Sequence, residues 1–143
     1  MIIVAIDPGM DGGISISAND PTLGYPVVNL NLTHDTLREY VIPGRLVVVE
    51  GVGTAGNHKL QQSFGESLGW ALGNRCQTYV VPPQVWQLPL RLKAVSYHAR
   101  KSELYRIAQE TCKDVTKSQS DAYLIMKWAY NQPKERLARY EYS

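Results

Sequence analysis

Three acidic residues occur where predicted elements would bring their side chains together. Asp7 follows the apolar run from Ile2 to Ile6, Glu50 follows the run from Leu46 to Val49, and Asp121 lies near the start of the last long predicted helix. In an open mixed sheet, sites form at the carboxyl ends of the central strands. Two carboxylates placed there at neutral pH repel each other unless a proton or a cation lies between them.

The pattern therefore predicts a site for a divalent metal ion, because Mg²⁺ and Mn²⁺ take oxygen ligands and often act on phosphate-containing substrates. Each acid also has a purely structural interpretation. Asp7 is a turn former before Pro8, Glu50 is an acid at the start of a loop, and Asp121 has capping-box spacing from Ser118. Taken together, the three positions favour a shared site, since the last helix must pack near the sheet.

The elements that would position these acids begin with three strands. Residues 2–6 predict a buried strand. Ile14, Ile16 and Ala18, alternating with Ser15 and Ser17, predict a second strand with one buried face, paired with the first as a hairpin. A loop at residues 19–21 and a third strand over residues 25–32 follow, and then a short helix in which Thr36 and Glu39 have capping-box spacing.

The rest of the chain alternates strands and helices. Residues 46–49 and 78–81 predict two further buried strands, separated by a helix from Asn57 to Gly73. Gly65, Gly69 and Gly73 recur every four residues in that helix, which predicts tight packing of its backbone on the sheet rather than a dimer seam. Helices over residues 99–112 and 118–130 come next, and the tail 134–143 is helical or frayed. The expected fold is α/β, a five-stranded mixed sheet in which an antiparallel meander joins parallel strands, flanked by helices.

The chain has 143 residues, of which 44% are hydrophobic and 20% charged. This length suits one domain over residues 1–143. No apolar run approaches the roughly 18 residues of a membrane span, and no basic-then-apolar leader begins the chain, so we expect a cytoplasmic protein without a membrane partner. Cys76 and Cys112 form no metal-binding or disulfide motif and are expected to be buried thiols.

Charge is unevenly distributed along the chain. Residues 1–75 hold four Lys or Arg and seven Asp or Glu, a net charge of −3, whereas residues 76–143 hold eleven and six, a net charge of +5. Seven basic residues crowd positions 91–117. Such a segment suits a polyanion-binding face, and solvated surface helices are the alternative explanation.

Three segments of the chain resemble one nuclease family. Ala5-Ile6-Asp7-Pro8-Gly9-Met10-Asp11-Gly12-Gly13 resembles the first-strand motif of RuvC-type Holliday junction resolvases, especially their bacteriophage members. Val47-Val48-Val49-Glu50-Gly51 resembles the second acidic strand of that family, and Ser120-Asp121-Ala122-Tyr123 resembles its last-helix motif. Residues 81–87 and 100–103 resemble intervening pieces, so the likeness runs from Met1 to about Tyr130.

The resemblance implies an RNase H-like fold and a homodimeric endonuclease of DNA recombination and repair. It would act on four-way DNA in a bacterial or phage-infected cell and hydrolyse a phosphodiester in each of two strands. Two Mg²⁺ ions, replaceable by Mn²⁺, would lie about 3.5 to 4 Å apart, with no small-molecule cofactor. Asp7 would bridge them, and Glu50 and Asp121 would complete their ligands. The residues expected to bind DNA phosphates are Lys101 first, then Arg100, Lys117, Lys93 and Arg91.

Two positions depart from the family pattern. Ser118 stands where bacterial members carry an acid or a histidine, and a hydroxyl is a weaker metal ligand than a carboxylate. Either the second metal is held more loosely, or Asp11 or Asp114 contributes. The stretch after Glu50 also lacks the aromatic residue that probes the junction centre in bacterial members, and His58 and Phe64 are the nearest candidates, with Phe64 expected in the core.

Three other functions also have to be weighed against the sequence. Actin-like and sugar-kinase ATPases share an acidic first turn, but they need two domains with nucleotide between them. An RNase H-like nuclease acting on RNA or RNA–DNA substrates is a second alternative. The short members that process ribosomal RNA precursors usually carry basic residues after Asp-Pro-Gly, where this chain has Met10 and Asp11. A non-catalytic module that binds DNA junctions is the remaining alternative, kept open by Ser118.

Overall fold

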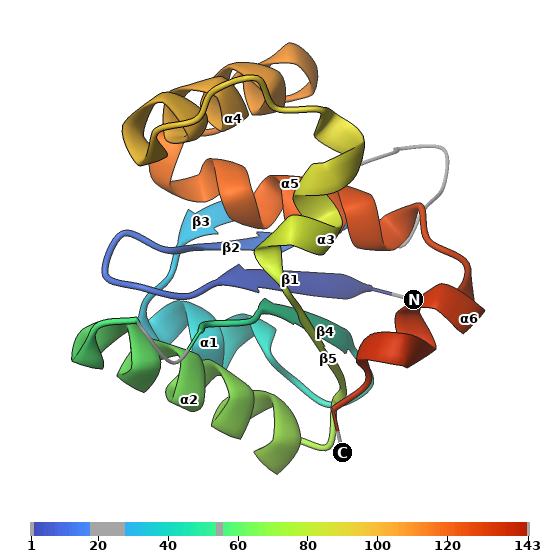
Figure 1. Cartoon of the computed structure of the whole chain (residues 1–143). Coiled ribbons are helices and arrows are strands. Elements are labelled where there is room, and N and C mark those ends of the chain that lie inside the picture. Colours follow the sequence, from blue (N-terminus) through green and yellow to red (C-terminus); the bar gives the residue numbers. More distant parts are fainter. Residues whose placement is uncertain (1, 18–27, 54–55, 143) are drawn as a thin grey trace.

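A five-stranded sheet forms the centre of the molecule (Figure 1). The computed structural model describes residues 2–17, 28–53 and 56–142. The sheet order is β3-β2-β1-β4-β5, in which β1, β2 and β3 pair antiparallel and β1, β4 and β5 pair parallel. The predicted mixed sheet is thus confirmed. Its strands are β1 (Ile3–Asp7), β2 (Gly13–Ile16), β3 (Val28–Asn31), β4 (Leu46–Glu50) and β5 (Gln77–Val81).

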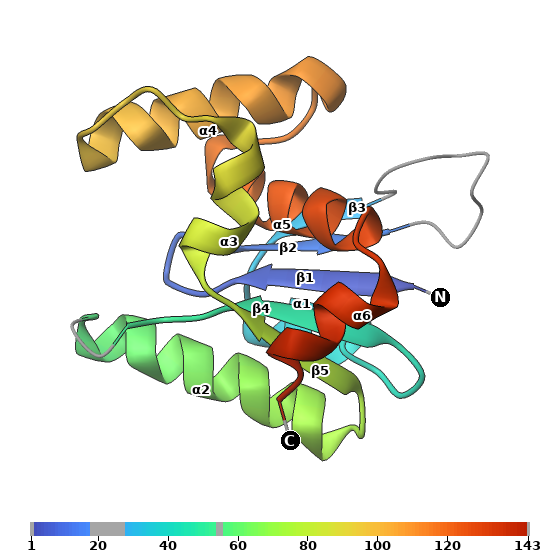
Figure 2. The same cartoon turned by 45° about the vertical axis from the view of Figure 1, so that its right-hand side comes forward.

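Helices cover both faces of the sheet, as the views in Figures 1 and 2 show. One face carries α1 (His34–Tyr40) and α2 (His58–Gly73). The other carries α3 (Pro83–Gln87) and α5 (Ser120–Tyr130), and α4 (Tyr97–Thr111) packs on α5 as an outer layer. Short 3₁₀ turns lie at Leu88–Leu90, Lys117–Gln119 and Ala138–Tyr140, and α6 (Lys134–Leu137) precedes the last of them.

The apolar runs lie at the centre because their alternate side chains fill two different cores. Ile3 and Ala5 of β1 face the α3, α4 and α5 side, whereas Val4 and Ile6 face α1 and α2. A β-branched run buried on both faces is typical of a central strand. Each fully buried aliphatic side chain contributes about 1.5 to 3 kcal/mol, so the strands that end in Asp7 and Glu50 are firmly anchored.

The second strand differs from its prediction, since β2 is buried on both faces. Ser15 Oγ donates to Asn29 Oδ1 at 2.7 Å. Ser17 Oγ accepts from the Ile3 amide at 2.8 Å. These bonds satisfy hydroxyls that would otherwise be costly to bury. Three predicted features lie outside the described residues: Ala18 at the end of the second strand, the loop at 19–21 and the start of the third strand at 25–27.

The helix starts correct two capping predictions. Helix α1 is capped by Thr33, whose hydroxyl accepts from the Thr36 amide at 3.0 Å, so the pair Thr36 and Glu39 does not form the box. Before α5, the capping box joins Thr116 to Gln119 around the 3₁₀ turn. Ser118 and Asp121 do not form the predicted capping box, because the Ser118 hydroxyl donates to Asn31 and the Asp121 carboxylate accepts from Lys101.

The glycines of α2 do not pack on the sheet as predicted. Gly65, Gly69 and Gly73 are exposed, and a Cβ built at any of them would meet none of the described atoms within 4 Å. Ser67 and Ala71 are the buried residues of this helix. A four-residue spacing defines one face of a helix, and here that face turns to solvent.

The C-terminal segment is ordered rather than frayed as far as the structure describes it. Leu137 is buried, Glu141 pairs with Tyr79, and the Tyr142 amide donates to the Thr78 carbonyl at 2.9 Å. This segment covers the outer edge of β5. Both cysteines are free, with Cys76 buried as predicted and Cys112 only half-buried. None of the described helices has the length and apolarity that crossing a membrane requires.

Candidate active site

The fold brings Asp7, Glu50 and Asp121 to one place. Asp7 and Glu50 are the last residues of β1 and β4, which are parallel neighbours with Ile6 opposite Val49. Parallel strands end at the same edge of a sheet, so both carboxylates emerge there. Asp121 lies in the first turn of α5, which packs across β1 and β2.

Burial and mutual repulsion dominate the electrostatics of these acids. Asp7 and Asp121 are buried, and Glu50 is partly buried. The pKa of Asp7 is held well above its ordinary range. Burial is the main cause, and the negative charges of Glu50 and Asp121 add to it. Burial and the charge of Asp121 raise the pKa of Glu50 to about 7. Full ionisation of the cluster is therefore unfavourable unless a cation binds beside it.

Lys101 of α4 supplies a cation inside this cluster. Its Nζ donates to Asp121 Oδ2 at 2.5 Å and lies 5.7 Å from the centre of the Tyr97 ring. Burial alone would lower the pKa of Lys101, but the charges of Asp121 and Asp7 outweigh that cost and raise it. The ammonium thus stays charged and balances part of the carboxylate charge.

Trp86 of α3 holds the second acid. Its side chain is 1% exposed, and Nε1 donates to Glu50 Oε2 at 2.8 Å. A hydrogen bond to an ionised group is stronger than a neutral one, so this bond fixes one oxygen of Glu50. It also opposes the rise in the pKa of Glu50.

Two close backbone contacts set the position of the site relative to the helices. The Gly9 amide donates to Ser63 Oγ at 2.9 Å, which ties the turn after β1 to α2. At Gly13, an added Cβ would lie 2.9 Å from both Gln119 Cα and the Ser118 carbonyl oxygen. Glycine at this position therefore lets β2 approach the turn that leads into Asp121.

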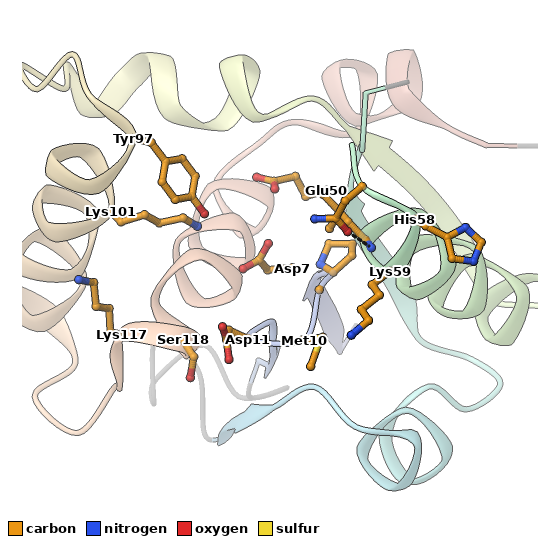
Figure 3. Close-up of a pocket in the computed structure, with 14 residues that line it drawn as sticks. Asp7, Met10, Asp11, Glu50, His58, Lys59, Tyr97, Lys101, Lys117 and Ser118 are labelled. Atoms are coloured by element: carbon orange, nitrogen blue, oxygen red, sulfur yellow. Dashed lines mark hydrogen bonds between the residues drawn. The ribbon is translucent and has the colours of Figure 1, made fainter. Parts of the chain in front are cut away.

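The acids open into a cavity of about 800 Å³, shown in Figure 3. Asp7 and Glu50 lie at its base, and Tyr97 and Lys101 extend into it from α4. A second hollow of about 440 Å³ adjoins it and shares Glu50, Tyr97 and Lys101 while adding Asp121. The cluster is thus accessible from two connected hollows.

The predicted DNA-binding residues divide into two groups. Lys101 and Lys117 line the larger cavity, and Arg100 lines the smaller one, where its Nη2 donates to Gln87 Oε1 at 2.5 Å. Arg91 and Lys93 lie in the loop before α4 and are not among the described residues that line either hollow. The backbone amide of Lys93 is held by the Glu103 carboxylate at 3.1 Å.

The structure also locates the residues at which the sequence departs from the family pattern and their possible substitutes. Ser118 lines the larger cavity, and its hydroxyl donates to Asn31 Oδ1 at 3.1 Å, so it is tied to β3. Asp11 lines the same cavity, whereas Asp114 is exposed and is not among its described lining residues. His58 is exposed at the cavity mouth, and Phe64 packs against the α1 and α2 core as expected.

The sequence prediction missed three residues at the site: Trp86, Tyr97 and Lys59. Lys59 and Tyr97 line the larger cavity. Trp86 belonged to a motif that matched the family, but the indole bond to Glu50 depends on how α3 folds back over β4. The sequence did contain a signal for Tyr97. Ser96 caps α4, so Tyr97 is the first residue of the helix, and residues four apart, such as Tyr97 and Lys101, lie on the same side of a helix.

The donor set fits a divalent ion in its chemistry. Carboxylates are hard oxygen ligands, and the Lys101 ammonium shows that a cation is already accommodated beside Asp121. The arrangement is not a preformed cage, since the described residues contain no group of three acid, histidine or cysteine side chains set to hold a metal. Lys101 contacts only Oδ2 of Asp121, so Oδ1 is not engaged by this pair.

Comparisons with known proteins find the fold in solved structures. No family model matches the chain, and no curated relative matches it. The RuvC structure from Thermus thermophilus is 16% identical, covers 99% of each chain and has a TM-score of 0.60. RuvC of that organism in complex with a Holliday junction substrate is 14% identical over 90% of this chain and 92% of that chain, with a TM-score of 0.55.

A viral protein shows the same similarity. The fowlpox virus Holliday junction resolvase is 16% identical over 91% of this chain and 97% of that chain, with a TM-score of 0.57. The five-stranded mixed sheet with its flanking helices matches the fold of these RuvC-type structures. At these low identities the comparison establishes a fold rather than a reaction. The chain has the RuvC-type, RNase H-like fold.

Proposed function

We propose that this protein is a divalent-metal-dependent endonuclease that cuts branched DNA, with the four-way junction as its principal substrate. The observation that carries the proposal is the convergence of Asp7, Glu50 and Asp121 around two adjoining hollows, both of which Lys101 lines. The shared fold supports it, because the similar structures include RuvC in complex with a Holliday junction and a fowlpox Holliday junction resolvase. We also propose that the protein cuts this DNA in the cytoplasm of a bacterial or phage-infected cell.

In this mechanism Asp7, Glu50 and Asp121 would hold the metal ions, Mg²⁺ or Mn²⁺, as two ions per site. When bound, such ions activate water and stabilise the leaving oxygen of a phosphodiester. Trp86 keeps one oxygen of Glu50 fixed, which limits the rotation of that carboxylate. Lys101 lines both hollows beside these acids, so its ammonium would pair with a DNA phosphate that enters them.

Paired nicks require two such sites. Each chain provides one set of three acids, and cuts in two strands of a junction need two sets, so we propose that the active form is a homodimer. Sedimentation equilibrium on the free protein and on its junction complex measures the stoichiometry. A complex holding a single chain would contradict this part of the proposal.

A cleavage assay tests the function directly. We expect wild-type protein with Mg²⁺ or Mn²⁺ to place paired nicks in a synthetic four-way junction while leaving linear duplex and RNA–DNA hybrid largely uncut. Asp7→Asn should abolish cleavage and retain binding. Preferential cleavage of the hybrid would favour an RNA-directed nuclease, and binding without cleavage by the wild type would favour a non-catalytic module.

Metal binding has a readout that does not depend on cleavage. If Mg²⁺ or Mn²⁺ binds only the folded protein, it stabilises the protein by about 2.7 kcal/mol at a hundred times its dissociation constant. We expect the melting temperature to rise with added metal, and the rise to shrink in Asp7→Asn. KCl at matched ionic strength is the control. An equal rise in both proteins would contradict a metal site at these acids.

A further inference from the structure

Tyr97 is an exposed aromatic residue at the entrance to the site. Its side chain is 70% exposed although it lies in the first turn of α4. It lines both hollows, and its ring lies beside Lys101 (Figure 3). Aromatic side chains bury large apolar surfaces when they can, so an exposed ring at a charged cavity is suited to contact a ligand.

The contacts of Tyr97 hold its ring near the acids. Lys101 Nζ lies 5.7 Å from the ring centre, and the His98 ring meets it edge-on with centres 5.6 Å apart. The start of α4 is fixed by the Ser96 hydroxyl, which accepts from the Ala99 amide at 3.3 Å. The ring and the ammonium therefore come to the cavity from adjacent turns of one helix.

Other exposed apolar side chains lie around the same hollows. Val95 is 95% exposed and lines the smaller hollow, and Met10 is 76% exposed and lines the larger one. Apolar side chains beside the lysines of this cavity match a ligand that has both charged and flat apolar parts. A nucleotide has both, since its phosphate pairs with lysine and its base stacks on an aromatic ring.

We propose that Tyr97 stacks on an unpaired base at the branch point and thereby favours branched over linear DNA. This inference rests on the proposed function. In an intact duplex each base is already stacked on its neighbours, so an exposed ring gains a base only where strands separate. Lys101 contributes to binding of any DNA, whereas Tyr97 contributes only where a base is free.

The test uses 2-aminopurine placed next to the branch point of a four-way junction and at the same sequence in linear duplex, with a chelator present so that no strand is cut. Wild-type protein should change the 2-aminopurine fluorescence on the junction and leave the duplex signal unchanged. Tyr97→Ala should lose that change and bind the junction about 5- to 160-fold more weakly, the range for removal of a base-stacking aromatic. Tyr97→Phe, which keeps the ring, should behave as wild type.

Controls separate stacking from indirect effects. Tyr142→Ala removes another exposed tyrosine, 45% exposed at the far edge of β5, and should change neither signal nor affinity. Lys101→Ala should weaken binding to both DNAs and reduce the salt dependence, whereas Tyr97→Ala should leave the salt dependence unchanged. Circular dichroism verifies that each variant folds.

Three outcomes would overturn the role of Tyr97. They are wild-type junction binding by Tyr97→Ala, equal loss on junction and duplex, and failure of Tyr97→Phe to restore the fluorescence change. Failure of the proposed function is seen separately, as wild-type protein that neither prefers nor cuts the junction.

Discussion

Trp86 combines two roles in a single side chain, because its ring fills the core while its one polar atom bonds to Glu50. Few residues fit such a place, since the indole must be buried and its N–H must still find an acceptor. An acid at the end of a strand would otherwise rotate freely toward solvent. The core thus determines the orientation of a site residue.

We expect Trp86→Phe to lower the free energy of unfolding by about 1 to 3 kcal/mol, because it leaves a partly buried carboxylate without its donor. Cleavage of junction DNA should slow while the KM for DNA changes little. Urea denaturation and initial rates measure the two effects. Trp128→Phe, in the same core, should affect stability without the selective loss of kcat; equal loss of kcat in both variants would contradict a positioning role for Trp86.

The raised pKa values of Asp7 and Glu50 predict how stability depends on pH in metal-free protein. Burial and like charges raise the pKa of Glu50 from its ordinary 4.5 to about 7, so between those values the folded state binds more protons than the unfolded state. Stability must then fall as pH rises through this window. Glu50→Gln should gain roughly 1 to 3 kcal/mol relative to wild type between pH 4.5 and 8. Urea denaturation at these pH values measures it; a constant difference would contradict the predicted shift.

At the scale of the elements, glycine acts differently in a strand and in a helix of this protein. Gly13→Ala would place a Cβ 2.9 Å from the backbone before α5, and we expect a loss of about 1 to 3 kcal/mol together with reduced cleavage. Gly65→Ala, in open space on α2, should instead stabilise by about 0.5 to 1 kcal/mol. Thermal unfolding of both variants measures the difference, and similar effects would contradict the close approach at Gly13.

Helices and strands could be predicted from the sequence where the spacing of apolar residues agreed with the residues that begin and end an element. Strand β4 and helix α2 fall within one residue of prediction, because an apolar run and the Asn57 and Gly73 boundaries are local features. The packing partners could not be predicted. Periodicity cannot show that Ser15 faces Asn29, that the α2 glycines face solvent, or that Lys101 reaches Asp121, since each depends on a segment far away in sequence.

At the scale of the whole molecule, the basic half of the chain does not form one uniform surface. Lys117 lines the cavity, whereas Arg91 lies outside its described lining. We expect Lys117→Ala to weaken DNA binding and to reduce the slope of log affinity against log salt by about 1. Arg91→Ala should change the slope much less. Fluorescence anisotropy across a salt series measures both, and equal slopes for the two variants would contradict this division.

The order of the elements also affects when the site forms during synthesis. Asp7 lies near the beginning of the chain, Glu50 follows in β4, and Asp121 with its partner Lys101 belongs to the last helices to emerge. Chains emerge from the ribosome with the N-terminal part first, at about 5 to 20 residues per second. A nascent chain can complete the five strands while its site still lacks the third acid. Any chemistry that needs all three acids therefore begins only after α5 has docked.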